Sequence, residues 1–276
     1  MTRAMQVSAP PGPATPAQAL DFQRRLDRAL ATRVEELPWG ASIHRDDLPH
    51  VTDLNVLIVE HVPPGLFATA VMVEADRFQA GLPQRAVRVD DQQAAPYLAP
   101  HFAAAGWIVY RTALMLLRRP PDRLVSSSEV TEVGVDQVHA AREAAIGRVH
   151  RDLDVAAEAV AVGALDHEDA RVRAFAALVG GEVAAYCLLR IGEGGAKLVE
   201  VEALARAQGH GLGRATIWAA ISAARRDRAN PIFVECEDKE WEKSVYRRLG
   251  FDEAGKVHRF IRPWGDPASG RFSFAY

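Results

Sequence analysis

Residues 208–214, Gln-Gly-His-Gly-Leu-Gly-Arg, carry three alternating glycines between an apolar extended run and a long amphipathic stretch. Glycine permits positive φ angles and lets another group approach the backbone closely. The free N–H groups of such a loop, and of the first turn of a helix after it, converge on one point that suits a phosphate or pyrophosphate. Arg214 can add a charge-assisted hydrogen bond. The sequence therefore predicts an anion site made mainly of backbone.

Two common phosphate-binding motifs do not fit this loop. A dinucleotide fingerprint reads G-x-G-x-x-G, but the position three after Gly211 is Arg214. A Walker loop needs a lysine followed by serine or threonine, and residues 208–215 contain no lysine. The ligand is therefore expected to belong to another class of phosphate-bearing molecule.

The elements around the loop indicate a mixed sheet with helices. After a short strand at 130–133, helical spacing at 136–147 and 153–165 is followed by alternating strands at 172–179 and 183–191. Gly180-Gly181 supplies the two-residue turn between these strands. The remaining elements are expected in the order strand, helix, strand, helix and a final strand pair, at 197–204, about 212–228, 232–237, 239–249, and 251–253 with 256–262. This order predicts an α+β fold rather than repeated βαβ winding.

The pattern Gln208-x-x-Gly211-x-Gly213 resembles the Q/R-x-x-G-x-G/A pyrophosphate loop of the GCN5-related N-acetyltransferases (GNAT). The order of the elements and the ending Tyr246…Gly250-Phe251 resemble the same family, over about residues 128–262. The resemblance implies a GNAT acyl-CoA N-acyltransferase fold. It also implies transfer of an acetyl group from acetyl-CoA, as cosubstrate, to an amine by direct attack.

The resemblance also assigns roles to particular positions. Backbone of the strand before the loop would bind the pantetheine arm, and the loop would bind the pyrophosphate. Tyr246 would protonate the leaving thiolate, which agrees with the pKa of a phenol being above that of a thiol. The implied cofactor-binding residues are Val201, Glu202, Ala203, Gln208, Gly209, His210, Gly211, Leu212, Gly213, Arg214 and Lys239.

An amine acceptor must lose a proton before it can attack, because most aliphatic amines are protonated at pH 7. The candidate bases are Glu200 and Glu202 on one strand and Glu235 and Glu237 on the next. Alternation places the members of each pair on one face of their strand. Glu202 is preferred because it is nearest the pantetheine stretch, while each of the four can equally be a solvated strand carboxylate.

The sequence departs from the family pattern at two positions. Lys239 stands where the family usually carries an asparagine that contacts the cofactor, and Ala205 stands in place of the usual proline. Lys239 either contacts a CoA phosphate or marks a lost contact.

The chain is expected to contain two tandem GNAT-like domains. The boundaries are a disordered leader at 1–16, a degenerate domain at 17–120, a linker at 121–128, a catalytic domain at 129–263 and a tail at 264–276. In the first domain, periodicity predicts helices at 17–37, 66–80 and 96–105, with strands at 41–45, 53–61, 86–90 and 107–118.

A weak internal repeat supports this duplication. Phe102, Gly106 and Trp107 recur as Tyr246, Gly250 and Phe251, at a spacing of about 144 residues. Phenylalanine at the tyrosine position has no proton to donate, and the first half has no glycine loop. We therefore expect the first half to have lost the cofactor site and to help wall the substrate cleft.

Composition limits the other classes of function. The 276 residues carry a net charge of −3, which gives no basic surface for nucleic acid, and no apolar run is long enough to cross a membrane. Cys187 and Cys236 lie in apolar runs without metal-ligand spacing, so two reduced thiols and no metal are expected. The expected protein is bacterial and cytoplasmic, a monomer or homodimer.

Three functions remain open from sequence. The first is acetylation of a small-molecule primary amine, the second is acetylation of a protein amine, and the third is a non-catalytic acyl-CoA-binding regulatory module. A closed pocket between the two halves would favour the small molecule, whereas an open acidic cleft would favour a peptide.

Overall fold

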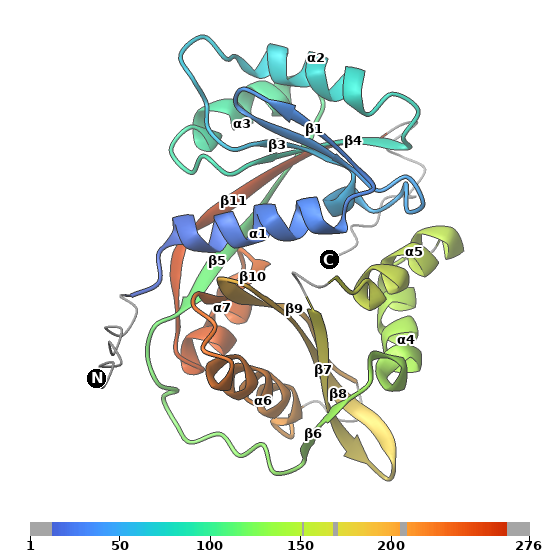
Figure 1. Ribbon diagram of the computed structural model, residues 1–276, viewed down its shortest axis with the longest axis vertical. Coiled ribbons are helices and arrows are strands. Elements are labelled where there is room, and N and C mark those ends of the chain that lie inside the picture. Colours follow the sequence, from blue (N-terminus) through green and yellow to red (C-terminus); the bar gives the residue numbers. More distant parts are fainter. Residues whose placement is uncertain (1–12, 151, 168–170, 205–208, 264–276) are drawn as a thin grey trace, which may run out of the picture.

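One mixed sheet of eleven strands runs through the whole molecule (Figure 1). The computed structural model describes residues 13–263 except 151, 168–170 and 205–208. The strand order is β1-β2-β3-β4-β11-β5-β10-β9-β8-β7-β6, with parallel pairing of β3 with β4 and of β9 with β10. The predicted α+β fold with a mixed sheet is confirmed.

The strands are β1 Arg33–Leu37, β2 Gly40–His44, β3 Val56–Val59, β4 Gln84–Val89, β5 Ile108–Leu117, β6 Val130–Val133, β7 Arg171–Val179, β8 Glu182–Gly192, β9 Gly195–Ala203, β10 Ile232–Glu237 and β11 Phe251–Pro263. The helices are α1 Pro16–Leu30, α2 Ala68–Phe78, α3 Ala95–Ala104, α4 His139–Val149, α5 Leu153–Ala164, α6 Leu212–Arg226 and α7 Glu240–Arg248, with 3₁₀ turns η1 Thr52–Leu54 and η2 Val135–Val138.

The last strand of each half lies in the middle of the sheet. β5, from the first half, pairs antiparallel with both β10 and β11. β11, from the second half, pairs antiparallel with both β5 and β4. Each half therefore completes the sheet of the other, and β5 and β11 occupy corresponding positions in the strand order, each next to the other half's strands.

The predicted internal repeat is visible in the packing next to these strands. Phe102 lies edge-to-face on Trp107 at 5.1 Å between ring centroids, and Tyr246 lies edge-to-face on Phe251 at 5.8 Å. Gly106 and Gly250, which precede the two partner rings, both have positive φ, at 79° and 99°. The two helix–glycine–strand units thus have the same local geometry, as a duplicated fold requires.

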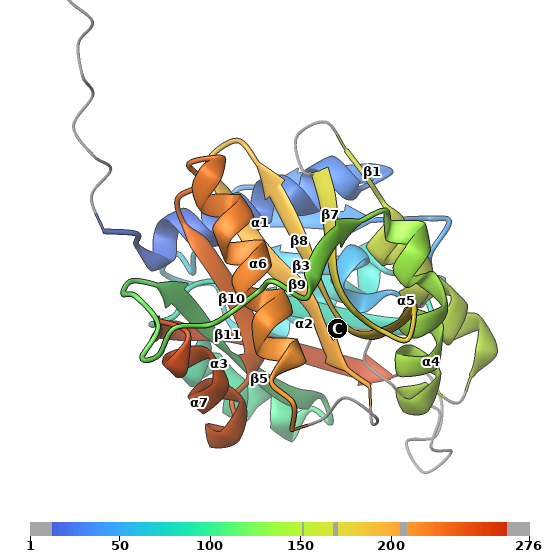
Figure 2. The same cartoon turned by 90° about the horizontal axis from the view of Figure 1, so that it is seen from below.

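Helices cover the central strands on both faces. Ala113 and Met115 of β5 pack towards α6 and α7, while Leu114 and Leu116 pack towards α1 and Phe233. Figure 1 shows α1 lying across the middle of the molecule between the two halves, and Figure 2 shows α6 beside α7 on the opposite face. α1 therefore lies, with the paired strand β5, at the junction of the two halves.

Three predicted elements are wrong in their extent. The helix expected at 17–37 ends at Leu30, and Arg33–Leu37 instead pairs with β2 in a hairpin, because tertiary pairing overrides an ambiguous apolar spacing. The strand expected at 53–61 is shortened by the turn η1. The final strand pair is one strand, β11, with a bulge between Glu253 and Gly255. Most of the expected leader, at 1–12, and the tail, at 264–276, lie outside the described residues.

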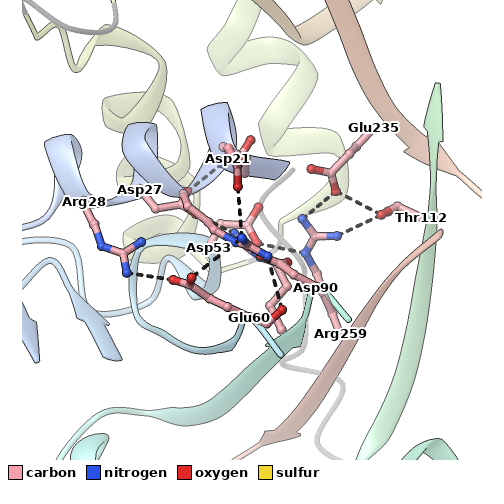
Figure 3. A network of polar contacts seen from close by, with 12 residues as sticks. Asp21, Asp27, Arg28, Asp53, Glu60, Asp90, Thr112, Glu235 and Arg259 are labelled. Carbon is pink, nitrogen blue, oxygen red and sulfur yellow. Dashed lines mark hydrogen bonds and ion pairs between the residues drawn. The ribbon is translucent and has the colours of Figure 1, made fainter. Parts of the chain in front are cut away.

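A buried network of charges ties α1 to the centre of the sheet (Figure 3). The Glu235 carboxylate accepts hydrogen bonds from Arg259 at 2.8 Å, Lys197 at 3.1 Å and Thr112 at 3.1 Å. Lys197 also donates to Gln23 of α1 at 2.6 Å. The network therefore joins β5, β9, β10 and β11 to the helix of the first half.

The second part of the network lies beneath α1. Gln23 donates to Asp27 at 2.6 Å, and Asp27 pairs with Arg88 of β4 at 2.7 Å. Arg88 pairs with Asp90, which also accepts from Arg24 of α1 at 2.8 Å. α1 is thus held by ion pairs to β4 and, through Lys197, to β9.

The cations around Glu235 hold the pKa of its carboxyl far below the ordinary value of 4.5, even though burial alone would raise it. A carboxyl whose folded pKa is depressed stabilises the fold above its unfolded pKa and loses that contribution as the pH falls towards the folded value. The contribution of Glu235 is therefore complete at neutral pH and decreases below about pH 4.5.

We expect Glu235→Gln to lower the free energy of unfolding by about 3–5 kcal/mol, because the amide leaves two buried cations without their carboxylate. The matched control is Glu132→Gln, which breaks the surface pair with Arg173 and should cost about 1 kcal/mol or less. Urea denaturation at pH 7 measures both. Equal losses in the two variants would contradict a structural role for the buried network.

Candidate active site

β9 and β10 separate part-way along their length. Their parallel pairing is recorded at Ala196, Lys197 and Leu198, opposite Ile232, Phe233 and Val234, and does not continue beyond these residues. On the other side of β9, the register with β8 shifts between Leu188 and Leu189, which leaves Val199 as a bulge. Backbone groups at 199–203 therefore face an opening between the two strands.

The glycine loop starts α6 at the end of β9. Gly209 and Gly211 have φ angles of 83° and 78°, and Gly211 is the N-cap of α6 without a capping side chain. A Cβ at Gly209 would meet no atom within 4 Å, so the loop backbone is accessible there. The first N–H groups of α6 have no partner within the helix and are available to an anion. Gln208 and Ala205 lie outside the described residues.

A cavity of about 510 Å³ lies where β9 and β10 separate, with walls from both halves of the chain. The second half contributes α4, α5, α7 and β8 to β11. The first half contributes α1, η1 and β5. Its lining includes Gln23, Leu26, Asp27, Leu30, Val51, Asp53, Leu54, Thr112, Ile146, Val149, His150, Val162, Tyr186, Arg190, Lys197, Glu200, Val201, Glu202, Glu235, Cys236, Glu237, Glu242, Tyr246 and Arg259.

Tyr246 is brought to this cavity by α7. It lines the cavity while one edge of its ring packs on Phe251. Burial raises the pKa of the Tyr246 phenol well above its ordinary value of 10, and the neighbouring Cys187, Cys236 and Glu242 add to the rise. Tyr246 therefore stays protonated and can only donate a proton at neutral pH.

The four strand carboxylates expected from sequence all line the cavity. Each also forms an ion pair with a basic side chain. Glu200 lies 2.8 Å from Arg142, Glu202 lies 2.9 Å from Arg148, and Glu235 lies 2.8 Å from Arg259. Glu237 pairs with Lys239. Each of the four carboxylates therefore already has a cation as its partner, and the cations around Glu235 hold the pKa of its carboxyl far below the ordinary value.

Sequence reasoning missed two further ionisable groups in the cavity. Glu242 lies on α7 one turn before Tyr246, and its pKa is raised by burial. His150 ends α4, is 4% exposed, and burial lowers the pKa of its imidazole. The spacing of four between residues 242 and 246 is a helical signal that could have identified Glu242, whereas a search for bases restricted to strands could not.

The remaining predicted residues lie at the edge of the site. Arg214 is exposed on the first turn of α6, and Lys239 is exposed at the start of α7. Cys187 and Cys236 are buried free thiols, as predicted, and burial raises the pKa of both, that of Cys236 to about 12.

Neither a metal-binding cluster nor a membrane-spanning helix is present among the described residues. Outside the gaps in the described chain, no group of three or more histidine, cysteine, aspartate or glutamate side chains is arranged to hold a metal ion. No helix in the described part of the chain has the length and apolar character needed to span a membrane.

The first half has no equivalent opening between its parallel strands. β3 and β4 stay paired to Val59 and Val89, and the Asp90 N–H continues the ladder by donating to the Val59 carbonyl at 2.9 Å. Phe102, the counterpart of Tyr246, is fully buried and stacks on Phe260 at 4.1 Å. A cofactor arm cannot enter between strands that remain hydrogen-bonded.

Comparison with known proteins agrees with this geometry. Residues 141–251 match the model of the acetyltransferase (GNAT) family. No curated protein matches the sequence. The solved structures that share the fold include a GCN5-related N-acetyltransferase from Kribbella flavida, with TM-score 0.63 and 19% identity, covering 92% of this chain and 96% of that one.

Two other solved structures are also similar over most of the chain. A conserved protein of unknown function from Staphylococcus epidermidis has TM-score 0.65 and 14% identity, covering 86% of this chain and 96% of that one. A tandem GNAT protein from the clavulanic acid biosynthesis pathway has TM-score 0.52 and 14% identity, covering 91% and 95%. Residues 141–251, which contain the separated strands, the glycine loop and Tyr246, therefore form an acetyltransferase domain of the GNAT family.

Proposed function

We propose that the protein transfers an acetyl group from acetyl-CoA to the primary amine of a small molecule. The observation that carries the proposal is the cavity at the opening between β9 and β10. Tyr246 lines this cavity, and the first half of the chain forms one of its walls. GNAT proteins are acyl-CoA N-acyltransferases, and acetyl-CoA is the donor proposed here.

The cofactor would enter along the opening. Its pantetheine arm would bind backbone of Val201, Glu202 and Ala203, whose edge towards β10 has no strand partner among the described residues. Its pyrophosphate would rest on the loop of Gly209, His210, Gly211, Leu212, Gly213 and Arg214. Lys239 would bind a phosphate by giving up its pair with Glu237, and Gln208, the other proposed contact, lies outside the described residues.

The acceptor would be small because the first half forms one wall of the cavity, which has a volume of about 510 Å³. Leu26 and Leu30 of α1 and Leu54 of η1 face it from that side. The lining is rich in carboxylates, which suits an acceptor that arrives as an ammonium ion. We propose that 17–120 is a degenerate GNAT-like copy whose present role is this wall, joined by the linker 121–128 to the catalytic domain 129–263.

The reaction is direct attack of the amine on the thioester. The C–N bond forms as the C–S bond breaks, and the thiolate of CoA takes a proton from the Tyr246 hydroxyl.

One specific observation favours a second candidate function, a module that binds acyl-CoA without catalysis. Lys239, at the position of the family's cofactor-binding asparagine, points its charge to Glu237 at the surface.

We expect acetyl-CoA to raise the melting temperature by several degrees at a hundred times its Kd, since binding to the folded state alone adds about 2.7 kcal/mol. Gly211→Ala should weaken binding about tenfold, because alanine is strained at its φ of 78°. Gly81→Ala, with a φ of 89° in the first half, carries the same strain far from the loop and should leave the ligand-induced shift unchanged. Stabilisation by NAD and not by CoA would sink the proposal.

We expect Tyr246→Phe to lower kcat about 100-fold or more with little change in the KM for acetyl-CoA, because the thiolate loses its proton donor. Initial rates with an amine panel and thiol detection measure this. An acetyl thioester of a more acidic thiol should lose much less rate in the variant, because its thiolate leaves without protonation. An unchanged kcat would show that the acid role is wrong.

We expect Leu26→Trp to raise the KM for the acceptor at least tenfold while leaving the acetyl-CoA thermal shift unaltered, because the indole fills the side of the cavity formed by α1. Leu26→Met keeps the volume and serves as the control. If both variants behave like wild type, the first half does not wall the acceptor site.

A further inference from the structure

Glu242 differs from the other carboxylates of the cavity. Glu200, Glu202, Glu235 and Glu237 each form an ion pair with a lysine or arginine. Within the described ranges, no lysine or arginine forms an ion pair with Glu242, whose hydrogen-bond partners are the backbone N–H and the side chain of Glu237. A half-buried carboxylate without a countercharge is costly to keep in a fold, so its presence in the cavity calls for a function.

The position of Glu242 is defined by that backbone contact. Its Oε2 accepts a hydrogen bond from the N–H of Glu237 at 2.9 Å, which anchors the side chain at the end of β10 where β9 has separated. The side chain of Glu237 also hydrogen-bonds to the Glu242 carboxyl and favours its protonated form. Glu242 and Tyr246, four residues apart on α7, both line the cavity, so a reacting group between them can contact both.

The surroundings of Glu242 favour proton uptake. Burial is the main cause that raises the pKa of its carboxyl, and the charge of Glu237 adds to it, while Lys239 and the Glu237 N–H act in the opposite direction. Cys236 of β10 and Tyr246 of α7 also face it and remain neutral. From β5 and β11, Arg111, Lys256 and Glu253 pair with Asp238 and Lys243 instead.

We propose that Glu242 is the proton acceptor for the ammonium group of the acceptor amine, an inference that rests on the proposed acyl transfer. The ammonium gives one proton to the Glu242 carboxylate and becomes a free amine. The amine nitrogen attacks the thioester carbonyl, the C–S bond breaks, and the thiolate takes the Tyr246 proton. The second proton of the new amide nitrogen restores Tyr246, and the proton on Glu242 leaves to solvent.

Two other cavity groups compete for this role. The place of Glu202 on its strand favours it from sequence, but Arg148 occupies its carboxylate at 2.9 Å. His150 is neutral and its Nδ1 is buried without a hydrogen-bond partner among the described residues, so only Nε2 could serve as the acceptor. The assignment to Glu242 therefore predicts that the acidic limb of the pH–rate profile depends on Glu242 and not on Glu202 or His150.

The test compares Glu242→Gln, Glu202→Gln and His150→Gln as full-length proteins. In Glu242→Gln the amide oxygen of the new side chain keeps an acceptor for the Glu237 N–H, so folding and the acetyl-CoA thermal shift should be unchanged. With an aliphatic amine, kcat/KM at pH 7 should fall about 100-fold or more in Glu242→Gln. The acidic limb of the pH–rate profile should disappear in this variant and persist in Glu202→Gln and His150→Gln. A weakly basic amine, already neutral at pH 7, should be acylated at nearly the wild-type rate.

A second measurement does not need turnover. In protein labelled with ¹³C at the glutamate carboxyls, one resonance that is absent from Glu242→Gln should titrate above the ordinary 4.5. Titration at or below 4.5, or loss of the acidic limb in Glu202→Gln or His150→Gln, would overturn the assignment. Failure of the wild-type protein to bind or turn over acetyl-CoA would instead reject the proposed function, because the carboxyl titration is read separately.

Discussion

The antiparallel pairing of β5 with β11 is the constraint on which the rest of the structure depends. Because each strand belongs to one half and borders the other half's sheet, neither half has a complete sheet by itself. The faces of these strands carry apolar residues on both sides, so they need α1 on one face and α6 and α7 on the other. The buried carboxylate of Glu235 beside them is stabilised because it forms ion pairs with both Arg259 and Lys197.

The cavity follows from this central pairing. β5 satisfies the edge of β10 on one side, which leaves β9 free to bend away at the Val199 bulge on the other. α1, held beside the gap through Gln23 and Lys197, forms one wall of the cavity. In the first half, β3 and β4 stay paired without such an opening, and Phe102 packs as core where Tyr246 lines a cavity.

Much of the second half could be predicted because its signals are local. The positive φ of Gly211, the start of α6 and the Tyr246–Phe251 contact follow from glycine freedom and helical spacing within a few residues. The spacing of Arg33–Leu37 predicts helix wrongly, because its pairing with β2 is decided by tertiary partners. The base could not be chosen from sequence, since all four strand glutamates look alike until Arg142, Arg148, Arg259 and Lys239 are seen beside them.

The sequence by itself determined the family of residues 141–251 and the local features that it predicts there: a glycine loop before a long helix and a tyrosine on the last helix. These depend on short-range spacing, which a linear pattern contains. Only the tertiary structure decided how the two halves share strands, that the cavity has walls from both halves and which carboxylate in it forms no ion pair with a lysine or arginine. Those properties arise from contacts between residues as far apart as Gln23 and Lys197, or Thr112 and Glu235, whose partners no local pattern specifies.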